Sequence, residues 1–278
     1  MSVSVLILTL NEATNLPGCL ESVAWCDDVV VLDSYSADST GEIARASGAR
    51  VIQRKFDNYS AHRDWARTEI AYQYPWVFSL DADERFTPEL MTEVREAVAS
   101  ALPEVALFLV RRKDHFFGKW IKHSSSYPIW FERLFRPDRV WMAPRIVNEH
   151  LETDGEIRRL FAPLIHYPFN KGVSHWLERH NQYSSMEAVE YRKQLAGARI
   201  DWRTVFAGDP IHKRLALKNL SVHLPCRPLL KFLYLYLLRR GFLDGFPGLT
   251  YCTLQAVYEY MIELKVRELR RRERGWPL

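Results

Sequence analysis

The sequence predicts an α/β protein with a Rossmann-like, mostly parallel central sheet flanked by helices, followed by a C-terminal helical extension. Short apolar runs alternate with helical segments through the first part of the chain, as parallel strands joined by right-handed crossovers do. Three of these runs end on acidic or amide side chains, at 11–12, 33 and 81–83. The last part of the chain is rich in leucine and aromatic residues, which predicts the extension.

The composition is that of an ordinary globular protein, with 47% hydrophobic and 26% charged residues in a chain of 278. A net charge of +4 is too small to indicate a nucleic-acid partner, and we expect none. Four cysteines without C-x-x-C spacing predict reduced thiols in the cytoplasm rather than disulfides or a zinc site. The apolar N-terminus lacks a basic segment and a cleavage site, so we interpret it as a buried strand.

Apolar runs bounded by polar residues predict the strands of the sheet. These strands cover residues 3–10, 29–32, 50–53, 76–80 and 105–110. Helices are predicted between them, where Pro17 marks a first turn and Gly48 marks an end. These helices cover residues 15–24, 36–48, 61–72 and 88–101.

Beyond residue 110 the pattern changes. Residues 111–170 break into short aromatic pieces with scattered prolines and histidines, which predicts loops and antiparallel strands. Residues 176–195 are again helical in composition. We therefore predict a main domain over 1–195 and a helical extension over 196–278.

The polar residues that end the strands are predicted to converge, because the carboxyl ends of parallel strands share one edge of a sheet. Alternate residues of an extended chain point the same way, so Asp81 and Asp83 can direct two carboxylates at one point. Mg²⁺ and Mn²⁺ prefer such ligands, in small number and together with substrate phosphates. The sequence therefore predicts a pocket for a phosphorylated ligand and a divalent metal.

Eight segments resemble the family 2 glycosyltransferases, which have a GT-A fold. Those typical of the fold are SVLILTLNEATNL at 4–16, VVVLDSYSADST at 29–40, HRDWA at 62–66 and FSLDADER at 78–85. Those that resemble the lipopolysaccharide-core β-glucosyltransferase subgroup are RLFR at 133–136, VNEHLE at 147–152, IHYPF at 165–169 and GFLDGFPG at 241–248. The resemblance implies that 1–195 is a GT-A catalytic domain, with a nucleotide-sugar half over about 1–110 and an acceptor half over about 111–195.

The resemblance also implies a set of nucleotide-sugar-binding residues at the strand ends and in HRDWA. They are Thr9, Asn11, Glu12, Asp33, Arg63, Asp81 and Ala82. Arg63 would make a charge-assisted hydrogen bond to the donor diphosphate or to the acidic triplet, and a surface ion pair is the alternative. Asn11 and Glu12 can instead cap the following helix. Nothing local in the sequence demands an acid at Asp33.

The metal ligands and the general base follow from the same resemblance. Asp83 would coordinate Mn²⁺ or Mg²⁺, which neutralises the departing nucleoside diphosphate. His166 is a further candidate ligand, and a structural core histidine is the alternative. Inversion at the anomeric carbon needs a carboxylate to take the acceptor's proton; Glu149 is implied, with Glu132 and Glu152 as rivals.

Two further parts of the sequence concern the acceptor. Residues 229–238 read LLKFLYLYLL, which is too short to cross a bilayer but is typical of an interfacial helix with flanking arginines. The alternative is a helical subdomain that packs on the rest of the chain or on another subunit, which would allow oligomerisation. Arg133 and Arg136 can hold an anionic acceptor or lie at the surface.

The resemblance thus implies an inverting hexosyltransferase that uses UDP-glucose or a related nucleotide-sugar. The expected acceptor is a lipopolysaccharide-core or other lipid-linked envelope glycan, and the expected location is the cytoplasmic face of the inner membrane. A polyprenyl-phosphate sugar synthase is one alternative, and its ionised acceptor needs no general base. A noncatalytic scaffold with this fold is the other alternative.

Overall fold

The computed structural model describes residues 2–142, 150–197 and 226–278. It divides into two compact units, which we describe separately. The sheet unit consists of residues 1–122 and 126–173, and the helical unit of residues 123–125 and 174–278. The domain boundary that the sequence places at residue 195 stays a prediction.

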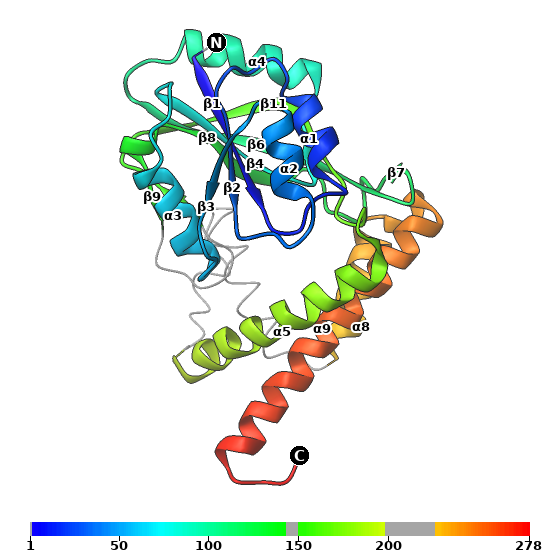
Figure 1. Cartoon of the computed structure of the whole chain (residues 1–278). Coiled ribbons are helices and arrows are strands. Elements are labelled where there is room, and N and C mark those ends of the chain that lie inside the picture. The colour runs from blue at the N-terminus through cyan, green and yellow to red at the C-terminus, as the bar shows by residue number, and fades with distance from the viewer. Residues whose placement is uncertain (1, 143–149, 198–225) are drawn as a thin grey trace. The chain divides into compact units, whose positions relative to one another are not determined.

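The two longest strands of the sheet unit lie in its second half (Figure 1). They are β1 (Val3–Thr9), β2 (Val29–Asp33), β3 (Arg50–Gln53), β4 (Trp76–Asp81), β5 (Glu84–Arg85), β6 (Val105–Phe116), β7 (Lys119–Trp120), β8 (Trp130–Phe135), β9 (Trp141–Met142), β10 (Leu151–Glu152) and β11 (Glu156–His166). The helices are α1 (Leu16–Ser22), α2 (Thr40–Ala46), α3 (Tyr59–Glu69) and α4 (Pro88–Ala99), with a 3-10 turn η1 (Pro137–Arg139).

Within the described residues, nine of these strands form one mixed sheet. Their order is β3-β2-β1-β4-β8-β6-β11-β5, and β7 pairs with β6. The first four strands in the chain are parallel, which confirms the predicted Rossmann-like half. The register of β1 sets Thr9 opposite Asp33 and Leu8 opposite Asp81, so the strand ends meet at one edge.

Apolar side chains of helices and strands form a core on each face of the sheet. On one face, Leu16 of α1, Ala44 of α2 and Leu90 of α4 share a core with the strands. On the other face, Ala66 of α3 packs in a second core together with Val77. Burial on both faces explains why these strands are nearly continuous apolar runs in the sequence.

The second half of the sheet departs from the prediction in two ways. β6 runs to Phe116, so the predicted end of this strand at Val110 is wrong. Its charged extension lies beside acidic side chains described below, which stabilise arginine in a position where the sequence suggests a loop. β11 pairs in parallel with β6, whereas β8 is antiparallel to both β4 and β6.

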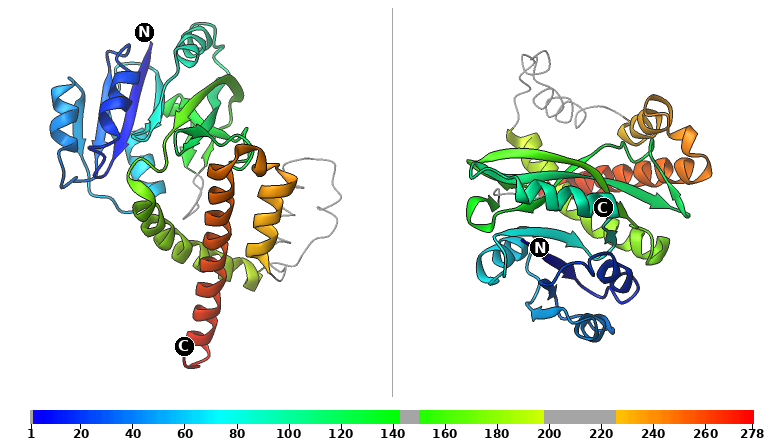
Figure 2. Two further views of the ribbon diagram at one scale, coloured as in Figure 1. Left: turned by 90° about the vertical axis from the view of Figure 1, so that its right-hand side faces the viewer. Right: turned by 90° about the horizontal axis from the view of Figure 1, so that it is seen from above.

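The helical unit contains most of α5 (Gly172–Gly197), α8 (Arg227–Leu233), a π-helical turn η2 (Tyr234–Leu238), a 3-10 turn η3 (Gly241–Asp244) and α9 (Phe246–Glu273). α8 packs beside α9 (Figure 2). The buried Arg227 ties the three helices together, because its guanidinium donates to the Tyr191 hydroxyl (2.8 Å) and to Glu259 (2.7 Å). No helix in the described part of the chain is long and apolar enough to span a bilayer.

Candidate active site at the carboxyl edge of the sheet

Asp33 ends β2 and lies buried at the carboxyl edge. Its carboxylate accepts hydrogen bonds from Thr9 Oγ1 (3.1 Å), from Gln53 Nε2 (3.2 Å), and from both the hydroxyl (2.5 Å) and the amide (3.1 Å) of Ser36. The structure therefore gives Asp33 a local role, closing the turn after β2, which the sequence did not reveal. The same bonds fix Thr9 and Asp33 side by side at the edge.

Asn11 and Glu12 follow β1 at the same edge. Asn11 has a φ of 55°, a left-handed conformation that asparagine tolerates, and its Oδ1 accepts from the amide of Ala37 (2.7 Å). Glu12 accepts from Asn15 Nδ2 (2.8 Å) and from Lys171 Nζ (2.9 Å). Lys171 is a partner that the sequence reasoning missed, because it lies far along the chain.

Asp81, the first acid of the triplet, has a guanidinium on each oxygen. Arg63 of α3 lies 2.9 Å from Oδ1, and Arg133 of β8 lies 2.7 Å from Oδ2. Burial acts to raise the pKa of Asp81, but the charges of Arg133 and Arg63 outweigh it and hold that pKa well below its usual range. Ala82 next to it is buried, and its carbonyl accepts from Arg85 Nη1 (2.9 Å).

Arg133 belongs to a buried row of alternating charges. It reaches Glu84 Oε1 at 2.5 Å, and Arg112 of β6 reaches the same oxygen at 3.3 Å. Arg112 also contacts Asp114 at 3.1 Å. The second oxygen of Glu84 accepts from the backbone amide of Asp81 (3.0 Å), so Glu84 shapes the acidic turn itself. Arg133 is thus a buried charge with two acidic partners and not a surface charge.

His166 reaches Asp83 through strand pairing. β5 pairs antiparallel with β11, so that His166 lies opposite Glu84, and the amide of Tyr167 donates to the carbonyl of Asp83 (2.9 Å). The imidazole Nε2 then lies 3.4 Å from Asp83 Oδ2, while Nδ1 lies 2.7 Å from Asp114. Burial and Arg112 act to lower the pKa of His166, but Asp83 and Asp114 outweigh them and raise it to about 9.

The residues at this turn fit a divalent cation that also binds phosphate. Asp83 and His166 supply one carboxylate and one imidazole, and Asp114 orients the imidazole from its far side, as metal-bound histidines are usually oriented. The described residues contain no group of three or more His, Cys, Asp or Glu side chains arranged to hold a metal. A two-residue site suits Mg²⁺ or Mn²⁺ when waters and substrate phosphates supply the remaining oxygens.

The general-base candidates and Arg136 are the other residues that the sequence singles out. Glu149 lies outside the described residues. Its rivals are both described: Glu132 accepts from His150 Nδ1 (3.1 Å), and Glu152 accepts from Trp141 Nε1 (3.1 Å). Arg136 stacks over the ring of Trp76, with its Cζ 4.7 Å from the centroid.

Sequence reasoning missed three charged residues of the site, Glu84, Arg112 and Asp114. Arg112 and Asp114 alternate along the end of β6, so a charged run that continues an apolar strand was the available signal. Charge normally marks the end of a strand, so this signal alone does not predict a longer strand. Glu84 lies in the FSLDADER segment. Its role depends on its ion pair with Arg133, which is distant in the sequence.

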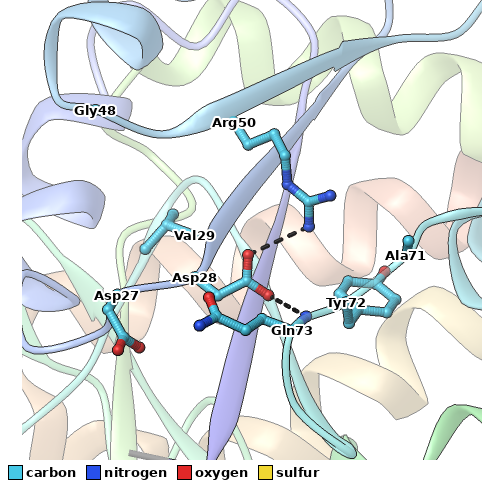
Figure 3. Close-up of a pocket in the computed structure, with 8 residues that line it drawn as sticks. All are labelled: Asp27, Asp28, Val29, Gly48, Arg50, Ala71, Tyr72 and Gln73. Atoms are coloured by element: carbon cyan, nitrogen blue, oxygen red, sulfur yellow. Dashed lines mark hydrogen bonds and ion pairs between the residues drawn. The ribbon is translucent and has the colours of Figure 1, made fainter.

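A separate hollow lies at the opposite ends of the strands. Its volume is about 410 Å³, and it lies where β2 and β3 begin. Figure 3 shows its buried carboxylate, Asp28, between Arg50 (3.2 Å) and the amide of Gln73 (2.8 Å). Ser4 Oγ also donates to Asp28 (2.5 Å), so these structural donors occupy the carboxylate. We therefore assign the site to the carboxyl edge.

The substitution Arg133→Met is expected to lower the free energy of unfolding by about 3 kcal/mol, because it leaves Glu84 and Asp81 short of a partner in a buried position. Urea denaturation followed by circular dichroism measures this loss. Arg158→Gln is the control, since Arg158 pairs with Glu156 at the surface, and its effect should stay within about 0.5 kcal/mol. Equal effects of the two substitutions would show that the buried row contributes no stability.

A parallel half with polar strand ends, joined to a mixed sheet and followed by an acidic turn, defines a transferase fold of the GT-A type. The model of one family, Glycosyl transferase family 2, matches residues 4–149. The chain belongs to this family.

Relatives agree with this assignment. An uncharacterized glycosyltransferase of Rickettsia bellii is 24% identical over 278 residues, which cover 96% of this chain and 86% of that protein. The lipopolysaccharide core biosynthesis glycosyltransferase LpsC of Rhizobium meliloti is 28% identical over 123 residues, or 42% of this chain and 44% of LpsC.

A solved structure is also similar. The glucosyl-3-phosphoglycerate synthase of Mycobacterium tuberculosis, in complex with Mn²⁺, UDP and glucosyl-3-phosphoglycerate, is 16% identical with a TM-score of 0.39. The match covers 49% of this chain and spans 57% of that one.

Proposed function

We propose that the protein is an inverting, metal-dependent hexosyltransferase that takes glucose from UDP-glucose. The proposed acceptor is a lipopolysaccharide-core or other lipid-linked envelope glycan. The observation that carries the proposal is the meeting of Asp83 and His166 beside Asp81, at the edge where Asp33 also ends its strand. The name of LpsC supports the acceptor class.

Residues at the carboxyl ends of the strands form the proposed donor site. Thr9, Asn11, Glu12 and Asp33 would bind the base and ribose, because paired carboxylate and amide groups select hydroxyl and N–H donors. Arg63 would contact the diphosphate while it holds Asp81. Asp83 and His166 would hold Mn²⁺ or Mg²⁺, which when bound neutralises charge on the leaving diphosphate.

Transfer needs a general base on the acceptor side. We assign this role to Glu149, which would remove the proton from the acceptor hydroxyl as that oxygen attacks the anomeric carbon. The bond from this carbon to the diphosphate breaks as the new glycosidic bond forms, and the configuration inverts. Glu132 and Glu152 are the alternatives. If the acceptor is a lipid phosphate, no base is needed, and the protein is a polyprenyl-phosphate sugar synthase.

Release of UDP from UDP-glucose, by slow hydrolysis or by transfer to an acceptor, tests the proposal. The assay compares Mn²⁺, Mg²⁺ and a chelator, with GDP- and dTDP-sugars as alternative donors. Metal-dependent turnover of UDP-glucose supports the proposal. The absence of both turnover and nucleotide binding with every donor supports the noncatalytic scaffold instead.

We also propose that the helical unit docks on an anionic membrane surface through residues 227–249. Ten large apolar side chains in this segment are exposed. They are Leu229, Leu230, Leu233, Tyr234, Leu237, Leu238, Phe242, Leu243, Phe246 and Leu249. Lys231, Arg239 and Arg240 lie among them, which suits an interfacial position over anionic lipid. Association with another subunit is the alternative.

Co-sedimentation with vesicles tests this docking. The double substitution Leu233→Glu with Leu237→Glu is expected to weaken binding to vesicles that contain phosphatidylglycerol by about tenfold or more, since it places charge at the lipid contact. Leu264→Glu is the matched control, because Leu264 is 51% exposed on α9 outside the segment. If the wild-type protein does not bind vesicles but forms a dimer, and the double substitution dissociates that dimer, the result supports association with another subunit.

A further inference from the structure

A patch of aromatic rings and cations lies on β6, β8 and β11, on side chains other than those of the acidic turn. Arg111 of β6 lies opposite Trp130 of β8 in the register of the sheet. The next residues along the two strands, Arg112 and Phe131, lie together in the buried charge row, with 4.3 Å between the guanidinium carbon and the ring centroid. Because side chains alternate across a strand, Arg111 and Trp130 project to the opposite face.

The rings of this patch surround Arg111. Its guanidinium carbon lies 5.6 Å from the Tyr127 centroid and 6.0 Å from those of Trp130 and Phe161. Arg159 covers Trp130 from another side at 5.2 Å. Trp130 and Phe161 meet edge to face, with centroids 5.8 Å apart. We call these five residues the Trp130 patch.

No carboxylate neutralises the cations of the patch among the residues that the structure describes. Arg111 and Arg159 form no ion pair there, whereas Arg112, one position along β6, has two acidic partners. The nearby Glu132 is hydrogen-bonded to His150. Arg111 Nε is buried and has no hydrogen-bond partner. A guanidinium held only by rings keeps its hydrogen-bond donors for a ligand.

Two lysines lie over a further aromatic ring beside the patch. Lys113 Nζ lies 4.5 Å and Lys122 Nζ lies 5.6 Å from the centroid of Trp120, which meets Tyr127 edge to face at 5.1 Å. These lysines likewise form no ion pair in the described part of the chain. Positive charge therefore extends over a surface wider than one side chain.

Rings and cations together recognise a definite chemistry. The C–H face of a pyranose packs on the negative face of an aromatic ring, and Trp130 and the 59% exposed Phe161 offer such surfaces. Guanidinium groups bind phosphate or carboxylate through paired, charge-assisted hydrogen bonds. A neutral glycan would leave the cations unused, and a bare anion would leave the rings unused.

We propose that the Trp130 patch binds an anionic sugar, a hexose that carries phosphate or carboxylate, within the acceptor glycan. This inference rests on the proposed function, because it assigns the patch to the acceptor of the same transfer. It moves the anion-binding role from Arg133 and Arg136, where the sequence suggested it, to Arg111 and Arg159.

Isothermal titration of the full chain at low salt tests the proposal with four probes: glucose 6-phosphate, glucuronate, glucose and inorganic phosphate. We expect glucose 6-phosphate or glucuronate to bind more tightly than glucose or phosphate alone, and the tighter of the two identifies the anion. Arg111→Gln and Phe161→Ala should each weaken this binding by about tenfold, or 1.4 kcal/mol. Arg158→Gln removes an equal charge from β11 outside the patch and should leave binding within about twofold.

The outcomes separate this inference from the proposed function. Equal effects of Arg111→Gln and Arg158→Gln, or no binding of either anionic hexose, overturn the patch. Circular dichroism checks that each variant is folded. Phe161→Ala changes an exposed ring, so it tests the patch even if Arg111→Gln alters the structure. UDP binding with Mn²⁺ is measured on the same samples. If UDP binds and the anionic sugars do not, only the patch fails; if UDP does not bind, the proposed function fails.

Discussion

The substitution Asp83→Ala is expected to abolish metal-dependent donor binding and sugar transfer together. Asp83 supplies the carboxylate that faces His166 Nε2 at 3.4 Å, and Asp81 cannot replace it because Arg63 and Arg133 occupy both of its oxygens. Without the cation, the diphosphate loses its main source of charge neutralisation. Titration of UDP with and without Mn²⁺, together with UDP release from UDP-glucose, should show losses of more than about 100-fold.

Asp154→Ala is the matched control for this experiment. Asp154 is 73% exposed and lies 3.6 Å from Arg139, so removal of its carboxylate should leave both measurements unchanged. Electron paramagnetic resonance of free Mn²⁺ adds a readout that does not depend on turnover. An Asp83→Ala protein that still binds Mn²⁺ and UDP together would exclude Asp83 as the ligand and leave the metal assignment without support.

The N-terminal half of the fold could be predicted because its signals are local. A strand buried on both faces must be apolar throughout, so β1, β2 and β4 stand out as runs that end at Thr9, Asp33 and Asp81. Parallel pairing then places those ends together without further information. The convergence of distant polar residues at one edge followed from this rule alone.

The second half could not be predicted to the same depth, because its charges depend on partners far along the chain. Arg133 lies 52 residues from Asp81, and a sequence cannot show that the two are in contact. Without that contact, the sequence predicts an acceptor contact or a surface charge for Arg133 and Arg136. The strand end at Arg112 and Asp114 could not be predicted for the same reason, because a charge buried in a sheet is stable only when an opposite charge lies beside it.

His166 shows where the two kinds of information meet. Its place after an apolar stretch made it a candidate ligand, but a core histidine has the same sequence context. The pairing of β5 with β11 favours the ligand over the core histidine. It directs Nε2 of His166 to Asp83, while Nδ1 contacts Asp114. The ligand role itself stays a prediction, which the Mn²⁺ measurements on a His166→Ala protein would test directly.

The substitution Glu149→Gln is expected to lower turnover by about 10²–10⁴-fold while it spares donor binding. The amide keeps the size and shape of the carboxylate but cannot accept the proton of the acceptor hydroxyl. UDP binding with Mn²⁺ and the rate of transfer at saturating donor, measured on the same protein, separate the two effects. This prediction rests on the VNEHLE segment of the sequence, since Glu149 lies outside the described residues.

The same assay on Glu132→Gln and Glu152→Gln identifies the base among the three candidates. Glu132 is hydrogen-bonded to His150 and lies two residues from Trp130 on the same face of β8, so it adjoins the proposed sugar site. A loss of rate with Glu132→Gln and none with Glu149→Gln would move the role to Glu132. If all three proteins keep the full rate, the acceptor oxygen is already ionised, and the lipid-phosphate acceptor of a polyprenyl-phosphate sugar synthase becomes the better explanation.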